Sequence, residues 1–155
     1  MPTSSRIAFV TDDDAVNTII RGQHTELAKA LLELVMNAID SGATYVNVVL
    51  TAEGFRVEDN GRGFGTYENV MERFRRIGKS HKDNLPQFGR MWMGRGQIMP
   101  WGRVEWSSGI HRMRTDIESF TGFDYQEGEP VEGCTVAGTF YESLSRFDWL
   151  KAQRD

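Results

Sequence analysis

The alternation of hydrophobic and polar residues predicts one long helix in the first third of the chain, over about 25–41. Apolar residues recur there at helical spacing and form a stripe that can face a core: Leu27, Leu31, Leu34, Val35 and Ala38. A second, roughly opposite stripe is polar, because Glu33, Asn37 and Asp40 stand at positions i, i+4 and i+7. Thr25 is a suitable N-cap and Gly42 a suitable stop.

The remaining pattern predicts mostly strands. Period-two alternation with β-branched residues indicates a hairpin of 44–51 and 55–59, joined by a turn at 52–54. A short strand is expected at 6–10 and a second helix at 67–77, with shorter helices at 96–101 and 144–150. Four further strands are expected at 102–108, 111–120, 123–128 and 135–143. Residues 1–155 are expected to form a single domain.

The composition excludes several classes of protein. Hydrophobic residues make up 39% of the 155 residues and charged residues 26%, which is typical of a globular protein. The net charge of −4 argues against general affinity for nucleic acid. One cysteine, Cys134, excludes an internal disulfide and a cysteine-rich metal site. Neither a leader peptide nor an apolar run of about 18 residues is evident, so a cytoplasmic protein is expected.

Positive charge is concentrated in one segment. Between Arg73 and Arg103 lie eight of the eighteen basic residues and a single acid, Asp83. Such a segment favours a local anionic ligand, although a solvated basic loop has the same composition.

The sequence DNGRGFG at 59–65 directly follows a predicted strand. Its glycines permit positive φ and close approach to the backbone. Asp59 would be partly buried at the end of the strand, where its carboxylate needs a hydrogen-bond donor such as the exocyclic amine of a base. An ordinary Asp-Asn-Gly turn would give the same residues.

A second glycine-rich segment, 77–98, contains glycines between arginines before a predicted helix. The N–H groups of such a loop and helix start can hold phosphates, with charge added by basic side chains. It is not a Walker A loop, because G-x-x-x-x-G-K-[ST] does not occur.

Taken together, ELVMNAIDSGATYVNVVL, FRVEDNGRGF, RRIGKSHK and FGRMWMGRG resemble the GHKL ATPases, and most closely their MutL and MORC branch. The resemblance covers about 25–140. It implies an α/β fold, a two-layer sandwich of the Bergerat type. In this fold a mixed, mostly antiparallel sheet has helices on one face, and the nucleotide lies between the helices and a lid (78–96).

The resemblance also implies ATP and Mg²⁺ as ligands and assigns roles to residues. Glu33 would be the general base for the attacking water, and Asn37 would hold Mg²⁺. Asp59 would accept from the adenine amine, with Gly61 and Gly63 allowing the base to approach. Asp40 would be structural. Contacts with the triphosphate would come from small and basic lid residues: Ser80, Lys82, Gly89, Arg90, Gly94, Arg95 and Gly96.

Two features depart from the family pattern. The last box, usually G-T-x-[VI], reads Gly133-Cys134-Thr135-Val136 here, so the candidate threonine is Thr135 or, later in the chain, Thr139. The lid also carries a bulky Met-Trp-Met sequence at 91–93.

The expected activity is slow, Mg-dependent ATP hydrolysis, with lid closure coupled to a protein partner or to self-association. The chain is too short for the second domain that delivers a lysine to the γ-phosphate in MutL and gyrase. The alternative is a non-catalytic, ATP-dependent switch. A histidine-kinase catalytic domain is less favoured, because G-x-G-L-G-L and a preceding helix with a phospho-accepting histidine are not found. DNA association is weakly supported, because the basic residues cluster where the triphosphate would lie.

Overall fold

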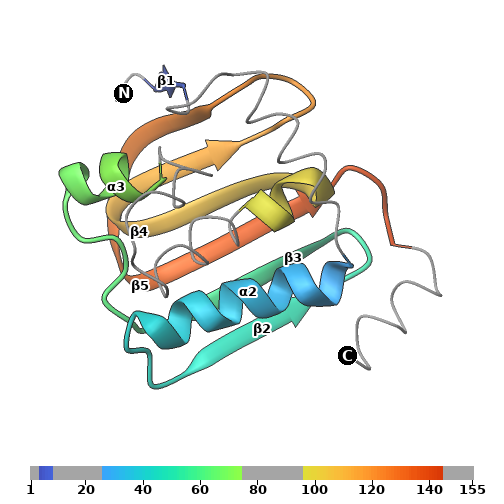
Figure 1. Cartoon of the computed structure of the whole chain (residues 1–155), viewed down its shortest axis with the longest axis horizontal. Helices are drawn as coiled ribbons and strands as arrows, with labels where there is room; N and C mark the ends of the chain where they lie inside the picture. Colours follow the sequence, from blue (N-terminus) through green and yellow to red (C-terminus); the bar gives the residue numbers. More distant parts are fainter. Residues whose placement is uncertain (1–3, 9–25, 75–95, 145–155) are drawn as a thin grey trace, which may run out of the picture.

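The computed structural model describes residues 4–8, 26–74 and 96–144 (Figure 1). The two described α-helices are α2 (Leu27–Asp40) and α3 (Tyr67–Phe74), and a 3₁₀ helix η1 covers Met99–Trp101. The strands are β1 (Ser5–Ile7), β2 (Val46–Leu50), β3 (Gly54–Asp59), β4 (Gly102–Thr115) and β5 (Phe123–Phe140). In the described part of the chain, no helix is long and apolar enough to cross a membrane.

The sheet is organised around β5, its longest strand. Along one edge β5 pairs with β4, and along the other it pairs with β1 near its start and with β3 near its end. The hairpin partner of β3, β2, completes the order β1-β5-β3-β2 on that side. Every pairing among the described strands is antiparallel, where the resemblance implied a mixed sheet.

The predicted hairpin is confirmed. After residue 101, however, the structure has two long strands where four shorter ones were predicted. Strand β4 passes through an irregularity at Gly109 without ending, and β5 runs unbroken from Phe123 to Phe140. Arg112 holds the irregular segment, because its guanidinium donates to the carbonyls of Gly109 (2.9 Å) and His111 (3.0 Å). The gap between the predicted strands 102–108 and 111–120 is therefore a bulge within one continuous strand. The segments 116–120 and 141–143, predicted as strand, lie beyond the ends of β4 and β5.

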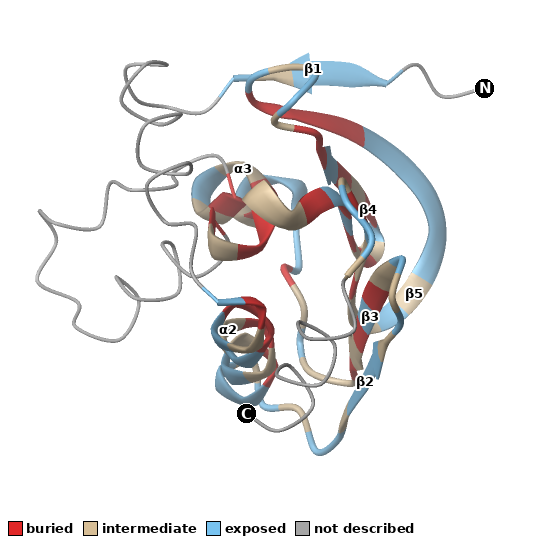
Figure 2. Ribbon diagram, turned by 90° about the vertical axis from the view of Figure 1, so that its right-hand side faces the viewer, coloured by how far each residue is buried: buried red, intermediate tan, exposed pale blue. Residues whose placement is uncertain are grey.

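The helices lie on one face of the sheet, and the core fills the space between the two layers (Figure 2). The apolar stripe predicted for α2 is largely confirmed: Leu27, Leu31, Leu34 and Ala38 are buried, together with Ala30, while Val35 is half-buried. Glu26 occupies the N-cap position instead of the predicted Thr25, and the helix stops before Gly42, whose φ is +80°. The two-layer α/β sandwich is thus the observed fold.

The aromatic part of the core joins α3 to the centre of the sheet. Phe74 makes edge-to-face contacts with Trp106 on β4 and Phe123 on β5, with ring centroids 4.9 and 4.7 Å apart. All three rings are at most 1% exposed. This packing holds the C-terminal end of α3 against β4 and the start of β5.

Candidate functional site

The DNGRGFG loop is fastened to the C-terminal end of α2. The side-chain oxygen of Asn60 accepts from the Thr44 N–H (2.8 Å), and its amide group donates to the Thr44 hydroxyl (2.7 Å). The Arg62 N–H donates to the Ser41 carbonyl (2.9 Å), and the Arg62 guanidinium donates to the Asp40 carbonyl (3.2 Å). Carbonyls that a helix end leaves without partners are thereby satisfied. The two sequence motifs thus form one structural unit.

The loop glycines are required by close packing within the protein. A Cβ at Gly61 would lie 2.2 Å from the Ser41 hydroxyl oxygen, and one at Gly63 would lie 2.2 Å from the Ser108 hydroxyl oxygen. Gly133 on β5 is equally constrained: its φ is +64°, and a Cβ would lie 1.9 Å from the Asp59 carbonyl oxygen. The expected reason for Gly61 and Gly63, the approach of a base, is therefore not needed to explain them. The structural role of Gly133 depends on its contact with Asp59, which is distant in sequence, so no local pattern predicts it.

A cavity of about 590 Å³ opens between α2, the DNGRGFG loop, α3 and the sheet. This volume is within the range of small-molecule sites. Its apolar walls come from Leu34, Ala38, Val57, Phe64, Trp106 and Val136, and its polar groups include Asn37, Asp40, Asp59, Arg62, Asn69 and Arg73. Asn37, Asp59 and Gly63, singled out in sequence, therefore lie around one cavity. Arg62, Asn69 and Arg73 were not singled out for the site, because charged or amide residues on a short helix and loop have no distinctive pattern.

Asp59 is the most buried ionisable group around this cavity, with 8% of its surface exposed. Burial raises the pKa of its carboxyl above the usual value, although hydrogen bonds from the main-chain N–H groups of Gly61 (2.7 Å) and Cys134 act in the opposite direction. A carboxylate has capacity for about four hydrogen bonds, so Asp59 can accept further donors from the cavity.

The two candidate threonines of the final box are not at the cavity. Cys134 and Val136 line it, and neighbouring residues of a strand point to opposite faces, so Thr135 faces the other side of the sheet. Thr139 shares that opposite face and is exposed. Cys134 is the register partner of Asp59. The assignment of Thr135 to the site is therefore corrected: the residue beside Asp59 is the cysteine.

The other predicted site residues are distributed as follows. Glu33 is half-buried on α2, one turn before Asn37, and is not among the residues that line the cavity. Gly96 is buried at the start of a helical segment, 96–98, that leads into η1, and it does not line the cavity either. Six lid residues lie outside the described residues: Ser80, Lys82, Gly89, Arg90, Gly94 and Arg95.

A buried histidine holds the far end of the loop. His111 on β4 is 5% exposed and lies 3.0 Å from the Gly65 carbonyl through Nε2 and 2.7 Å from the Tyr125 hydroxyl through Nδ1. Because a carbonyl only accepts, Nε2 carries the proton and Nδ1 accepts from Tyr125. Burial raises the pKa of Tyr125 to about 12, which keeps that hydroxyl protonated. His111 has a structural role, and the described residues contain no cluster of His, Cys, Asp and Glu that could hold a metal ion.

Comparison with known proteins defines the class of protein. Residues 25–102 match the model of the histidine kinase-, DNA gyrase B- and HSP90-like ATPases. The chain belongs to this family, which supports ATP binding and, in general terms, ATP hydrolysis.

Two known proteins are similar to this chain over most of its length. The chain is 28% identical to the DNA mismatch repair protein MutL of Leuconostoc citreum (strain KM20); the alignment covers 87% of this chain and 22% of that protein. The fold is similar to that in the crystal structure of the N-terminal domain of a DNA repair protein, with a TM-score of 0.53 and 17% identity over 90% of this chain and 42% of the other. The chain thus spans about a fifth of the MutL protein that it matches. The resemblance to the GHKL family is confirmed, and the relative at 28% identity is a MutL protein.

Proposed function

We propose that this protein binds Mg-ATP in the cavity between α2 and the DNGRGFG loop and hydrolyses it slowly. The observation that carries the proposal is the convergence of Asn37 and Asp59, from different elements, on one cavity of nucleotide size. Membership of an ATPase family supports the same ligand.

The inner part of the cavity suits an adenine ring. Val57 and Val136 provide apolar surface on the sheet, and Leu34 provides it on α2. The Asp59 carboxylate is already held in place by main-chain donors, and it would accept from the exocyclic amine. A buried acceptor of this kind selects strongly for a base that carries a donor at that position, because a base without one would leave the carboxylate unpaired.

The described residues fit a magnesium ion that is bound through the nucleotide. They include no group of three or more protein ligands, and Mg²⁺ commonly uses one or two protein oxygens together with phosphates and water. Asn37 lines the cavity, and its side-chain oxygen would be such a ligand. The ion would supply neutralisation of phosphate charge.

Hydrolysis requires a positioned water, and we assign this to Glu33. Its carboxylate would accept the proton as the water oxygen bonds to the γ-phosphorus and the bond to the β-phosphate oxygen breaks, which gives ADP and inorganic phosphate. On sequence alone we assign contacts with the triphosphate to the lid (78–96). Lid closure would be coupled to a protein partner or to self-association.

The test is a Glu33→Ala variant. Turnover should fall by at least about a hundredfold, because general-base catalysis is lost, while the dissociation constant for ATP should stay within about threefold. Phosphate release and calorimetric ATP binding measure the two quantities. Glu105→Ala is the matched control, because Glu105 is exposed on the opposite face of the sheet. Unchanged turnover in Glu33→Ala would exclude the role assigned to Glu33.

One observation favours a second function, a non-catalytic switch: Glu33 is not among the residues that line the cavity. Under this alternative, the protein would bind ATP without hydrolysing it, and binding would order a surface that a partner recognises. ATP binding by the wild-type protein without phosphate release above background would select the switch. The MutL relative raises DNA as a partner, and this is tested by binding that persists with saturating ATP and weakens steeply with salt.

A further inference from the structure

Helix α2 has a second apolar stripe, which faces outward. Leu32, Met36 and Ile39 are 56%, 44% and 52% exposed. They stand at i, i+4 and i+7, so they form one continuous stripe along the helix. This stripe is nearly opposite to the buried one, and Figure 2 shows the exposed residues of α2 on the side turned away from the sheet. A surface helix of a globular protein ordinarily carries polar residues there.

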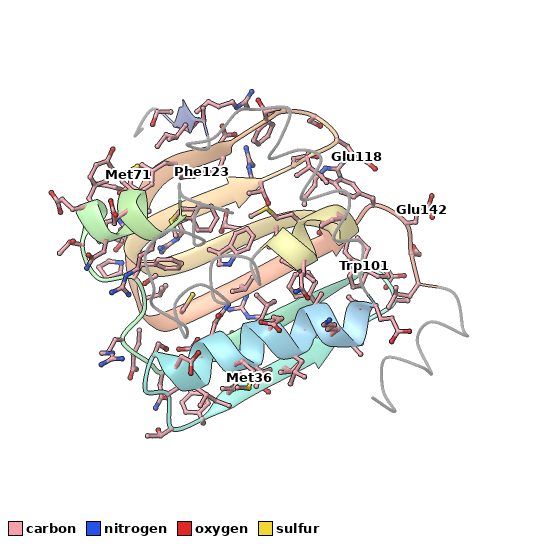
Figure 3. The ribbon with its side chains drawn as sticks, viewed as in Figure 1. Met36, Met71, Trp101, Glu118, Phe123 and Glu142 are labelled. Carbon is pink, nitrogen blue, oxygen red and sulfur yellow. The ribbon has the colours of Figure 1, made fainter. Side chains whose placement is uncertain are left out.

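The edge of the sheet extends this apolar surface. Val48 is the register partner of the buried Val57, so it lies on the helix-covered face of the sheet. It is nevertheless 44% exposed, because β2 is the last strand in the sheet order. Figure 3 shows Met36 at the side of α2 that borders β2. Exposed apolar residues that gather in this way are typical of an interaction site.

The charges beside the stripe indicate which partner fits. Lys29 and Asp40, both exposed, flank the stripe on the same side, one near each end of the helix. A two-fold axis perpendicular to two α2 helices makes them antiparallel and leaves the charged flanks of both copies on the same side of the pair. Because the helices run in opposite directions, Lys29 of one copy then lies near Asp40 of the other. The midpoint between Lys29 and Asp40 differs from the midpoint of the apolar stripe by one residue, or about 1.5 Å along the helix. The spacing of the apolar residues and the positions of the two charges therefore match those of a second, antiparallel copy of the same surface.

We propose that the outer face of α2 binds a second copy of this chain in an antiparallel, two-fold arrangement. Met36 meets Met36 of the second copy near the axis, Leu32 meets Ile39, and two Lys29–Asp40 ion pairs form at one side. One helix of this length and a strand edge give a small interface, so the expected dissociation constant is on the order of micromolar. This dimer requires neither ATP binding nor hydrolysis. It would place the two nucleotide cavities on the same flank of the helix pair as the ion pairs, because Asn37 and Asp40 both belong to the polar stripe of α2 and both line the cavity.

The experiment is sedimentation of the full chain without nucleotide, from about 1 µM to about 1 mM. The wild type should show a concentration-dependent monomer–dimer equilibrium. Met36→Glu should weaken association by at least about a hundredfold, because two carboxylates would be buried side by side. Ile110→Glu is the matched control: Ile110 is an exposed apolar residue on β4, and its replacement should leave the equilibrium unchanged.

Charge reversal tests the antiparallel arrangement. Lys29→Glu should weaken association about tenfold, since it replaces two attractive contacts by two repulsive ones, and the double variant Lys29→Glu/Asp40→Lys should restore it. Urea unfolding of each variant distinguishes lost association from lost folding. A wild type that stays monomeric throughout, a dimer that Met36→Glu leaves intact, or a double variant as weak as Lys29→Glu would each overturn the proposal. ATP binding measured on the wild type, Met36→Glu and Ile110→Glu reports separately on the proposed function, because neither substituted residue lines the cavity.

Discussion

Two buried aspartates, one in each half of the sheet, have carboxylates with different kinds of partner. Asp59 and Asp124 are 8% and 9% exposed. Asp124 accepts from Arg6 (2.9 Å) and from Arg114 (3.3 Å), and these partners, Arg6 foremost, lower its pKa. Asp59 forms no ion pair with the described residues, and burial raises its pKa.

This difference in ion pairing distinguishes a carboxylate that stabilises the fold from one that is available to a ligand. The β1 end of the sheet uses Asp124 to join β1 to β4 across β5, so its charge is compensated within the protein. At the cavity, the Asp59 carboxylate has main-chain donors, and no described residue forms an ion pair with it. Perturbed carboxylates that face a cleft are typical of binding sites, and Asp59 meets that description while Asp124 does not.

The largest expected effect is the difference in ATP affinity between two single variants, Asp59→Asn and Asp124→Asn. In Asp59→Asn the main-chain donors retain the side-chain oxygen, which leaves the NH₂ group to face the adenine amine. The affinity for ATP should fall by about a hundredfold, whereas Asp124→Asn should stay within about twofold. Isothermal titration calorimetry measures both. Equal affinities in the two variants would remove the distinction between the two sites.

A smaller effect, in the opposite order, is expected on stability. Asp124→Asn should lower the free energy of unfolding at neutral pH by about 1 kcal/mol, because its arginine partners are more than half exposed and solvent screens the ion pairs. Asp59→Asn should be neutral or slightly stabilising, because it removes a desolvated charge. Urea unfolding gives both values. A loss in Asp59→Asn larger than in Asp124→Asn would contradict the comparison.

The pH dependence of these two changes should have opposite signs. The pKa of Asp124 is lowered from 3.8, so its stabilising contribution is present above that value and is lost as the pH falls through the folded pKa. The pKa of Asp59 is raised from 3.8, so its charge opposes folding above the folded pKa, and this penalty disappears as the pH falls towards 3.8. The free energy of unfolding of each variant should be compared with that of the wild type from neutral pH to about pH 3. As the pH falls, any extra stability of Asp59→Asn should disappear first. The lower stability of Asp124→Asn should approach the wild-type value only at still lower pH.

The smallest effect is expected at Cys134, the residue beside Asp59. Cys134→Thr gives the final box the family's usual threonine, and the new side chain has a similar volume. Because the main-chain N–H that Cys134 donates to Asp59 is unchanged, ATP affinity should stay within about threefold. A displacement titration with a fluorescent nucleotide measures this difference. A loss of more than tenfold would show that the sulfur itself contributes to binding.

The parts of this fold that were predictable depend on local patterns. The amphipathic spacing of α2 and the alternation of the β2–β3 hairpin require no distant partner, and both were predicted closely. The convergence of Asn37 and Asp59 followed from a family resemblance, since no local rule brings residues 22 positions apart together. Their connection through Asn60 and Thr44 is visible only in the structure.

The errors have tertiary causes. The predicted strands 102–108 and 123–128 end at or just before Gly109 and Gly128, whereas Arg112 stabilises a bulge at Gly109 and lies beside Gly128. Thr135 was assigned by its distance from Gly133, but the pleat of β5 turns it to the opposite face. The outward stripe of α2 was not predicted, because spacing alone does not show which apolar residues of a helix are exposed.

The unbroken course of β5 has a consequence for hydrogen exchange. Near its start, amide groups lie between β1 and β4, and from Cys134 onward they lie between β3 and β4. Between these blocks, over 126–133, β4 is its pairing partner among the described strands, and the bulge interrupts even that pairing. Opening should therefore begin in the middle of the longest strand rather than at its ends. In exchange experiments β5 should appear as two slow blocks separated by a fast one, so the two halves of the sheet can open independently.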